Sequence, residues 1–167
     1  MKKGVVKTFF KKIDWGIFLL SIITVSSTAI LASLFMARGI NSFWYLTVRP
    51  SITPPGWVFS VVWTILYILL AWSLYSCLTC TKNKKICSRV ELLFAVNLLL
   101  NFLWGFLFFW MRKPLFAFFD IIALWISIIA IIYGTWNVNR KSALLLIPYL
   151  LWVTFAGVLN YISVLKS

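Results

Sequence analysis

Residues 44–75 read WYLTVRPSITPPGWVFSVVWTILYILLAWSLY and contain the two features that decide the fold. The first is a loop, because Pro50, Pro54 and Pro55 each remove a backbone donor and disfavour helix in the preceding residue. The second is an uncharged apolar run over residues 57–80. As a helix this run would be about 36 Å long at roughly 1.5 Å per residue, enough to cross a bilayer. We therefore expect a rigid aromatic loop at the mouth of a membrane helix, where a loop usually does more than connect.

The composition indicates an integral membrane protein. The chain has 167 residues, of which 63% are hydrophobic and 11% charged, whereas about a quarter of a soluble domain is charged. The net charge of +13 would suit a nucleic-acid ligand if the basic residues were spread through a domain. They lie instead at the ends of apolar runs, where they reach lipid headgroups and fix topology. We therefore expect the lipid bilayer as a partner and no nucleic acid.

Five apolar runs predict an all-α integral membrane protein, a five-transmembrane-helix bundle with a proline-rich loop between the first two helices. The expected spans are residues 15–37, 57–80, 90–110, 115–136 and 143–165. Residues 38–56 are expected to be irregular apart from a short turn. Short connections should make sequential helices antiparallel; they are residues 82–89, 111–114 and 137–142. The first run is longer than the roughly 7–15 apolar residues of a signal peptide, so residues 1–14 are interpreted as a basic extension and 15–167 as one membrane domain.

The basic residues are unequally divided between the two ends of this bundle. Eleven of the sixteen Lys and Arg residues fall on the side of the N-terminus. The other five are Arg38, Arg49, Arg112, Lys113 and Lys166. The positive-inside rule therefore predicts a cytoplasmic N-terminus for a multi-pass protein of the plasma membrane.

The residue types exclude several kinds of catalytic site. There is no His, so a Ser-His-Asp or Cys-His arrangement is impossible. The three acidic residues, Asp14, Glu91 and Asp120, lie near different helix ends and do not form a carboxylate pair. Cys77 and Cys80 form a C-x-x-C without a second ligand pair, which favours free thiols over a metal site. We expect no metal and no cofactor.

Aromatic and amide side chains recur at helical spacing within the spans. The stripes are Trp63 and Tyr67; Asn97, Asn101 and Trp104; and Trp152, Phe155, Ala156 and Asn160. An amide in hydrocarbon needs a partner, so these faces should point inward. Inward amides can join helices or line a pocket, and the spacing alone leaves both open. Asp120 is the most costly group to bury and also needs a partner.

The same residues resemble the TspO/MBR family, whose members are also called tryptophan-rich sensory proteins, translocator proteins or peripheral benzodiazepine receptors. The matches in the opening stretch are Trp44, Tyr45, Pro50, Pro54, Pro55, Trp57, Val58, Phe59, Val62, Trp63, Leu66 and Tyr67. Further along they are Asn101, Trp104, Phe108, Phe109, Asp120, Trp125 and, in the last span, Pro148, Tyr149, Leu150, Trp152, Val153, Phe155, Ala156, Leu159 and Asn160. Arg49, Ile52 and Asn97 replace the usual Lys, Trp and Gln of the family.

The resemblance implies a membrane receptor or transporter-like protein whose pocket lies between helices, is capped by the first loop and binds porphyrins such as protoporphyrin IX. Sterols and drug-like planar compounds are bound by some members. The lining implied by position is Tyr45, Pro54, Phe59, Trp63, Tyr67, Asn101, Trp104, Trp152 and Ala156. An alternative is a light-dependent porphyrin-degrading enzyme that uses Trp63 and Trp152, and a plainer one is a membrane scaffold. With Ile52 in place of Trp, the lid contact should be weaker or the ligand range different.

Three further hypotheses concern contacts and geometry. Leu159, Tyr161 and Lys166 fit a loose sterol-contact pattern. Ala29, Ser33 and Ala37 form a small-residue row that could pack inside the bundle or form a homodimer. Finally, Trp63 and Trp152 should flank one cavity, with Trp104 and Asn101 beside it.

Overall fold

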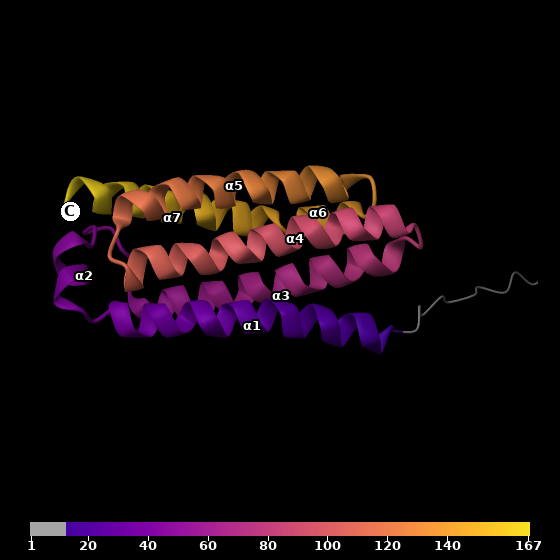
Figure 1. Cartoon of the computed structure of the whole chain (residues 1–167), viewed down its shortest axis with the longest axis horizontal. Helices are drawn as coiled ribbons and strands as arrows, with labels where there is room; N and C mark the ends of the chain where they lie inside the picture. Colours follow the sequence, from indigo (N-terminus) through magenta and orange to yellow (C-terminus); the bar gives the residue numbers. More distant parts are fainter. Residues whose placement is uncertain (1–12) are drawn as a thin grey trace, which may run out of the picture.

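A computed structural model describes residues 13–167 as an elongated bundle of helices (Figure 1). Within these residues five helices are long and apolar enough to cross a membrane, which confirms the predicted fold class and a multi-pass membrane protein. In chain order the elements are α1 (Trp15–Gly39), α2 (Phe43–Val48), α3 (Gly56–Cys80), α4 (Lys84–Gly105), the π-helical turn η1 (Phe106–Trp110), α5 (Pro114–Trp136), α6 (Arg140–Leu144) and α7 (Ile147–Leu165). Most of the predicted basic extension, residues 1–12, lies outside the described residues.

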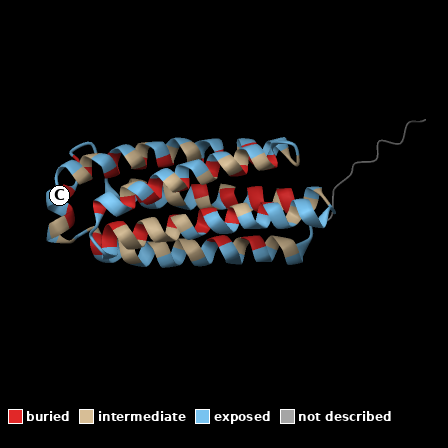
Figure 2. Ribbon diagram, turned by 45° about the horizontal axis from the view of Figure 1, so that its top comes forward, coloured by how far each residue is buried: buried red, intermediate tan, exposed pale blue. Residues whose placement is uncertain are grey.

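The long helices pack side by side, with α1 against α3 and α4, and α5 against α4 and α7. Buried residues follow the inner faces of the helices and exposed residues the outer faces (Figure 2). The exposed side chains are largely apolar, for example Leu31, Ile68 and Leu151. An apolar outer surface of this kind is stable only when hydrocarbon surrounds it.

Polar caps extend two helices beyond their predicted starts. The third span begins at Lys84 because Asn83 Oδ1 accepts a hydrogen bond from the Lys85 N–H at 3.0 Å. Asn139 caps α6 in the same way, accepting from Lys141 N–H at 3.1 Å. The last span is then interrupted between α6 and α7, since Pro148 has no N–H with which to continue the ladder.

The prediction that residues 38–56 are irregular is wrong for α2. Ser42 Oγ accepts a hydrogen bond from Tyr45 N–H at 3.2 Å and so caps a short helix. Pro50 then forces Arg49 into an extended conformation (ψ 129°), which ends the helix. The prolines therefore end α2 at its C-terminus, but they do not prevent a helix from forming before Pro50. The segment still lies across the end of the bundle as a cap (Figure 1).

Basic residues occupy both ends of the bundle. Without the five lysines of residues 1–12, the end at the α3–α4 connection carries six Lys and Arg and the end at α2 carries five. The predicted cytoplasmic N-terminus thus depends on the basic extension and stays a prediction.

Gly39 lets the end of α1 lie directly against η1. A Cβ atom at Gly39 would come within 2.7 Å of Phe109 Cδ1 and 2.8 Å of Phe109 Cβ. Phe109 is itself buried and cannot move aside cheaply. We expect Gly39→Ala to lower the free energy of unfolding by about 1–3 kcal/mol, the usual cost of overpacking. Reversible unfolding in mixed detergent micelles would measure the change.

Gly157→Ala is the matched control for this prediction. A Cβ atom there would meet only Ile121 Cγ2, at 4.0 Å, and alanine has the higher helix propensity. The Gly157 variant should therefore be as stable as the parent or slightly more so. Equal destabilisation by the two substitutions would contradict the close approach at Gly39.

Candidate functional site

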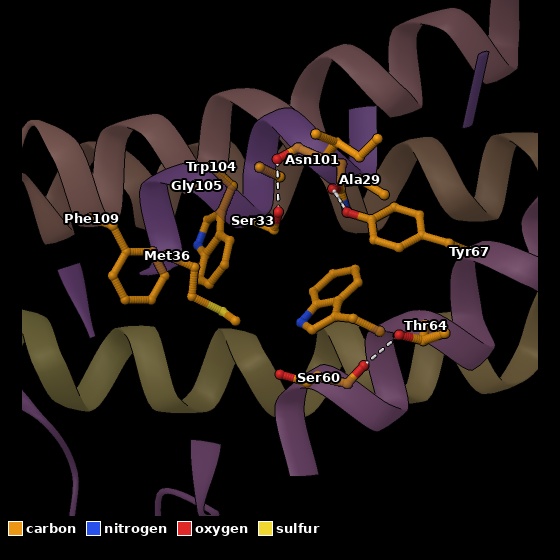
Figure 3. Close-up of a pocket in the computed structure, with 13 residues that line it drawn as sticks. Ala29, Ser33, Met36, Ser60, Thr64, Tyr67, Asn101, Trp104, Gly105 and Phe109 are labelled. Carbon is orange, nitrogen blue, oxygen red and sulfur yellow. Dashed lines mark hydrogen bonds between the residues drawn. The ribbon is translucent and has the colours of Figure 1, made fainter. Parts of the chain in front are cut away.

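A cavity of about 280 Å³ lies between α1, α3 and α4, and Figure 3 shows the residues that line it. We call it the side cavity. Its lining residues are Ala29, Ile30, Ala32, Ser33, Met36, Ser60, Trp63, Thr64, Tyr67, Asn101, Trp104, Gly105 and Phe109. Asn101 and Gly105 are buried at its inner wall, whereas Ile30, Ser33, Ser60 and Thr64 are exposed. The side cavity therefore opens laterally between α1 and α3, toward the surrounding bilayer.

Aromatic rings form the walls of the side cavity. On α3, the rings of Trp63 and Tyr67 lie 5.5 Å apart at an angle of 30°. On α4, Trp104 stacks on Phe108 at 5.5 Å and 20°, and meets Phe109 edge-on at 5.9 Å. Figure 3 shows Tyr67 and Trp104 projecting into the same space from different helices. Flat ring faces in a mostly apolar space suit a planar, apolar ligand.

Hydrogen bonds lead from the cavity wall into the bundle. Tyr67 Oη donates to Asn101 Oδ1 at 2.6 Å, and Asn101 Nδ2 donates to Tyr149 Oη at 3.1 Å. Tyr149 in turn donates to Asn97 Oδ1 at 3.3 Å, and Asn97 Nδ2 donates to Ser127 Oγ at 2.8 Å. The two asparagines are 0% and 3% exposed, which confirms the predicted inward faces. Asn97 joins helices, whereas Asn101 joins helices and also lines the cavity.

A second, much smaller cavity of about 30 Å³ lies beneath the proline loop, and we call it the loop chamber. Its lining residues are Tyr45, Pro50, Thr53, Phe59, Trp104, Phe108, Phe109, Ala156, Leu159, Asn160 and Ser163. This volume has room for little more than one water molecule. Burial raises the pKa of the Tyr45 phenol, an effect that Arg49 partly opposes, so the phenol is neutral at physiological pH.

Trp104 belongs to both cavities and forms the wall between them. Its indole N–H donates to Asn160 Oδ1 at 3.0 Å. Asn160 is held in turn, because its Nδ2 donates to the Pro114 carbonyl oxygen at 2.8 Å. The position of this wall is therefore set by one hydrogen bond and by stacking on Phe108.

The predicted binding residues divide between the two cavities. Trp63, Tyr67, Asn101 and Trp104 line the side cavity; Tyr45, Phe59, Ala156 and again Trp104 line the loop chamber. Pro54 and Trp152 line neither of the two. The structure thus does not bring Trp63 and Trp152 to one cavity. Trp152 packs edge-on against Phe59 at 5.4 Å, and its buried N–H has no hydrogen-bond partner among the described residues.

The three residues of the sterol-contact pattern do not share a cavity. Leu159 lines the loop chamber, and Tyr161 lies on an apolar groove between α5 and α7. Lys166 Nζ donates to the Arg49 carbonyl oxygen at 3.1 Å, at the end of the bundle. Sterol contact through this pattern stays a prediction.

Sequence reasoning missed the contribution of α1 to the side cavity. Ala29, Ala32, Ser33 and Met36 all line it. The signal in the sequence is the small-residue row Ala29, Ser33 and Ala37, whose spacing predicts a surface for packing or dimerisation. Two of its three members face the cavity. Homodimerisation stays a prediction.

Asp120 lies buried in α5 without the expected partner. It is 7% exposed, and its Oδ2 atom accepts no hydrogen bond within residues 13–167. In the same part of the chain, no three His, Cys, Asp or Glu residues come together as metal ligands.

Comparison with known proteins identifies the family to which the chain is similar. A sequence model of the TspO/MBR family matches residues 18–165. The tryptophan-rich protein TspO of Chlorobaculum tepidum is 42% identical over 120 residues, covering 71% of this chain and 76% of that protein. The protein of the same name from Archaeoglobus fulgidus is 40% identical over 142 residues, covering 84% and 90%. The translocator protein of Bos taurus is 32% identical over 126 residues, covering 74% and 75%.

Proposed function

Since the chain belongs to the TspO/MBR family, we propose that this multi-pass membrane protein binds tetrapyrroles such as protoporphyrin IX in the side cavity. The observation that carries the proposal is the pair of aromatic walls contributed by α3 and α4. Trp63 and Tyr67 form one wall, and Trp104 the other. A porphyrin is planar and largely apolar, so it gains most from flat rings on either side.

The polar groups of the cavity suit the edge of such a ligand. Ser33, Ser60 and Thr64 lie at the mouth, where they are exposed. A carboxylate on the rim of a porphyrin could accept hydrogen bonds from these hydroxyls while the ring lies deeper. A few polar groups around an apolar space are the usual means of orienting a ligand.

The size of the side cavity bears on how a macrocycle would enter. Its volume of about 280 Å³ is slightly below the roughly 300–1,000 Å³ of pockets that enclose drug-sized ligands. A tetrapyrrole would therefore be only partly enclosed unless a wall moved. Trp104 is the wall that separates the side cavity from the loop chamber. Its displacement would add Tyr45, Phe59 and Ala156 to the lining, and these residues belong to the set that the family resemblance implies.

A titration in the dark tests the proposal. Protoporphyrin IX added to the purified protein in detergent should quench tryptophan fluorescence saturably, with one ligand per chain and no loss of the porphyrin absorption bands. Two of the ten tryptophans, Trp63 and Trp104, line the side cavity, so a ligand there should quench them directly. Quenching that rises linearly without saturation would contradict a specific site.

Illumination of the same complex separates binding from the enzymatic alternative. A binding protein should leave the porphyrin spectrum no more altered than free porphyrin under the same light. New absorbing products that form only with the protein would favour the light-dependent degrading enzyme.

A further inference from the structure

The α2 helix, the start of α5 and the C-terminus lie at the same end of the bundle (Figure 1). A groove with basic side chains in its lining lies between them. Its volume is about 570 Å³, and it shares no lining residue with the side cavity or the loop chamber. The basic side chains in its lining are Arg112, Lys113 and Lys166. The larger apolar ones are Trp44, Leu115 and Phe116. We call it the end groove.

Among residues 13–167, no Asp or Glu side chain lines the end groove. No ion pair forms to Arg112 or Lys113 within residues 13–167, and neither side chain makes a hydrogen bond there. Asp14 caps α1 at the opposite end of the bundle, where Glu91 also lies in the second turn of α4, and Asp120 is inside a span. Lys166 donates one hydrogen bond to the Arg49 carbonyl oxygen, and an ammonium group has three to give.

The backbone at Arg112 is unusual. Its φ angle is +55°, and it is the one non-glycine residue with positive φ among those described. Glycine adopts this left-handed conformation far more readily than arginine does. The conformation connects η1 to α5, because Met111 N–H donates to the Phe106 carbonyl and Lys113 N–H to the Leu107 carbonyl. Glycine would therefore fit the backbone at position 112 at least as well as arginine does.

The geometry points to the end groove as a binding site for the phosphate headgroup of an anionic phospholipid. Its residues lie where two spans meet water, since α5 begins at Pro114 and α7 ends at Leu165. Phospholipid headgroups occupy this level of the bilayer. The guanidinium and ammonium groups would hold the phosphate. Leu115 and Phe116, both exposed, would contact the upper part of the acyl chains, and Trp44 has the amphipathic ring typical of this boundary.

Thermal unfolding in detergent, followed by tryptophan fluorescence, can measure this binding. The three probes are a short-chain phosphatidylglycerol, a phosphatidylcholine with the same chains, and inorganic phosphate. Phosphatidylglycerol should raise the unfolding midpoint at concentrations where phosphatidylcholine and phosphate do not. The preference for phosphatidylglycerol over phosphatidylcholine is the ratio of the concentrations that raise the midpoint equally. This ratio should fall roughly fivefold for each groove charge removed, the usual contribution of a basic residue near an anionic surface.

The informative variant is Arg112→Gly combined with Lys113→Gln. Glycine suits the backbone at position 112, so the variant should fold, and it should lose the preference for phosphatidylglycerol. Lys84→Gln combined with Lys85→Gln removes the same charge from the opposite end and should keep the preference. Protoporphyrin binding should be unchanged in both variants, which separates this proposal from the proposed function.

Four results would overturn the proposal. The first is that phosphatidylcholine stabilises the protein as much as phosphatidylglycerol does, and the second is that inorganic phosphate does so. The third is that the Lys84/Lys85 control variant loses the preference for phosphatidylglycerol to the same extent as the Arg112/Lys113 variant. The fourth is that protoporphyrin displaces phosphatidylglycerol. The second would identify phosphate alone as the ligand. The fourth would make the groove part of the porphyrin site.

Discussion

Replacing Trp63 by alanine should weaken protoporphyrin IX binding by about 1–3 kcal/mol, or roughly 5- to 150-fold, if stacking on a porphyrin resembles stacking on a nucleic-acid base. Trp63 lines the side cavity and lies 5.5 Å from Tyr67 and 6.1 Å from Tyr149, ring to ring. Its loss would remove the larger ring of the α3 wall and leave a gap that a planar ligand cannot fill. The fluorescence titration in the dark, repeated on the variant, gives the change directly.

The control for Trp63 is Trp110→Ala. Trp110 ends η1 and is 52% exposed, and its ring lies under the Arg38 guanidinium at 5.6 Å. It lines neither the side cavity nor the loop chamber, so its removal should change the dissociation constant by less than about twofold, within the range of neutral surface changes. If the two variants bind equally well, the side cavity is not the porphyrin site.

The spans could be predicted because their signals are local. Uncharged apolar runs bounded by prolines and basic residues require membrane helices whatever the packing. The helix starts at Lys84 and Arg140 were predicted too late, because basic residues in a first turn resemble a connection. Asn83 and Asn139 supplied the capping signal in each case. Ser42 supplied it for α2, but the prolines that follow obscured it.

The site could be predicted only in part. Trp63, Tyr67, Asn101 and Trp104 were recognised because aromatic and amide groups at helical spacing in hydrocarbon require an explanation. Ala32 and Gly105 carry no such signal. Their importance lies in the close approach of α1 and α4, where a Cβ atom on Gly105 would lie 3.7 Å from the Ala32 carbonyl oxygen.

The separation into two cavities is a property of side-chain conformation. Trp104 divides them because its indole reaches Asn160, which is distant in sequence. Phe59 likewise meets Trp152 on α7 through its ring. A pattern along the chain identifies these residues but not the partner each one meets, so the role of Trp152 stays a prediction.

Asn101→Leu should lower the free energy of unfolding by about 1–3 kcal/mol. The substitution keeps a side chain of similar size. It deprives the Tyr67 hydroxyl of its acceptor and the Tyr149 hydroxyl of a donor. Both hydroxyls then lie in a nearly dry interior, where an unmade hydrogen bond costs most. Reversible unfolding in mixed micelles measures the effect. Asn137→Leu at the exposed end of α5 is the control and should change stability little.

A double-mutant cycle with Tyr67→Phe shows whether this cost comes from the hydrogen bond between α3 and α4. If it does, the two substitutions together should cost about 0.5–1.5 kcal/mol less than the sum of the single changes. Purely additive costs would mean that Tyr67 and Asn101 act independently despite their 2.6 Å contact. Coupling would have a consequence for binding, since the same hydrogen bond fixes the Tyr67 ring that forms part of the cavity wall. Tyr67→Phe should then weaken protoporphyrin binding although the phenyl ring remains, because the ring would no longer be held in place.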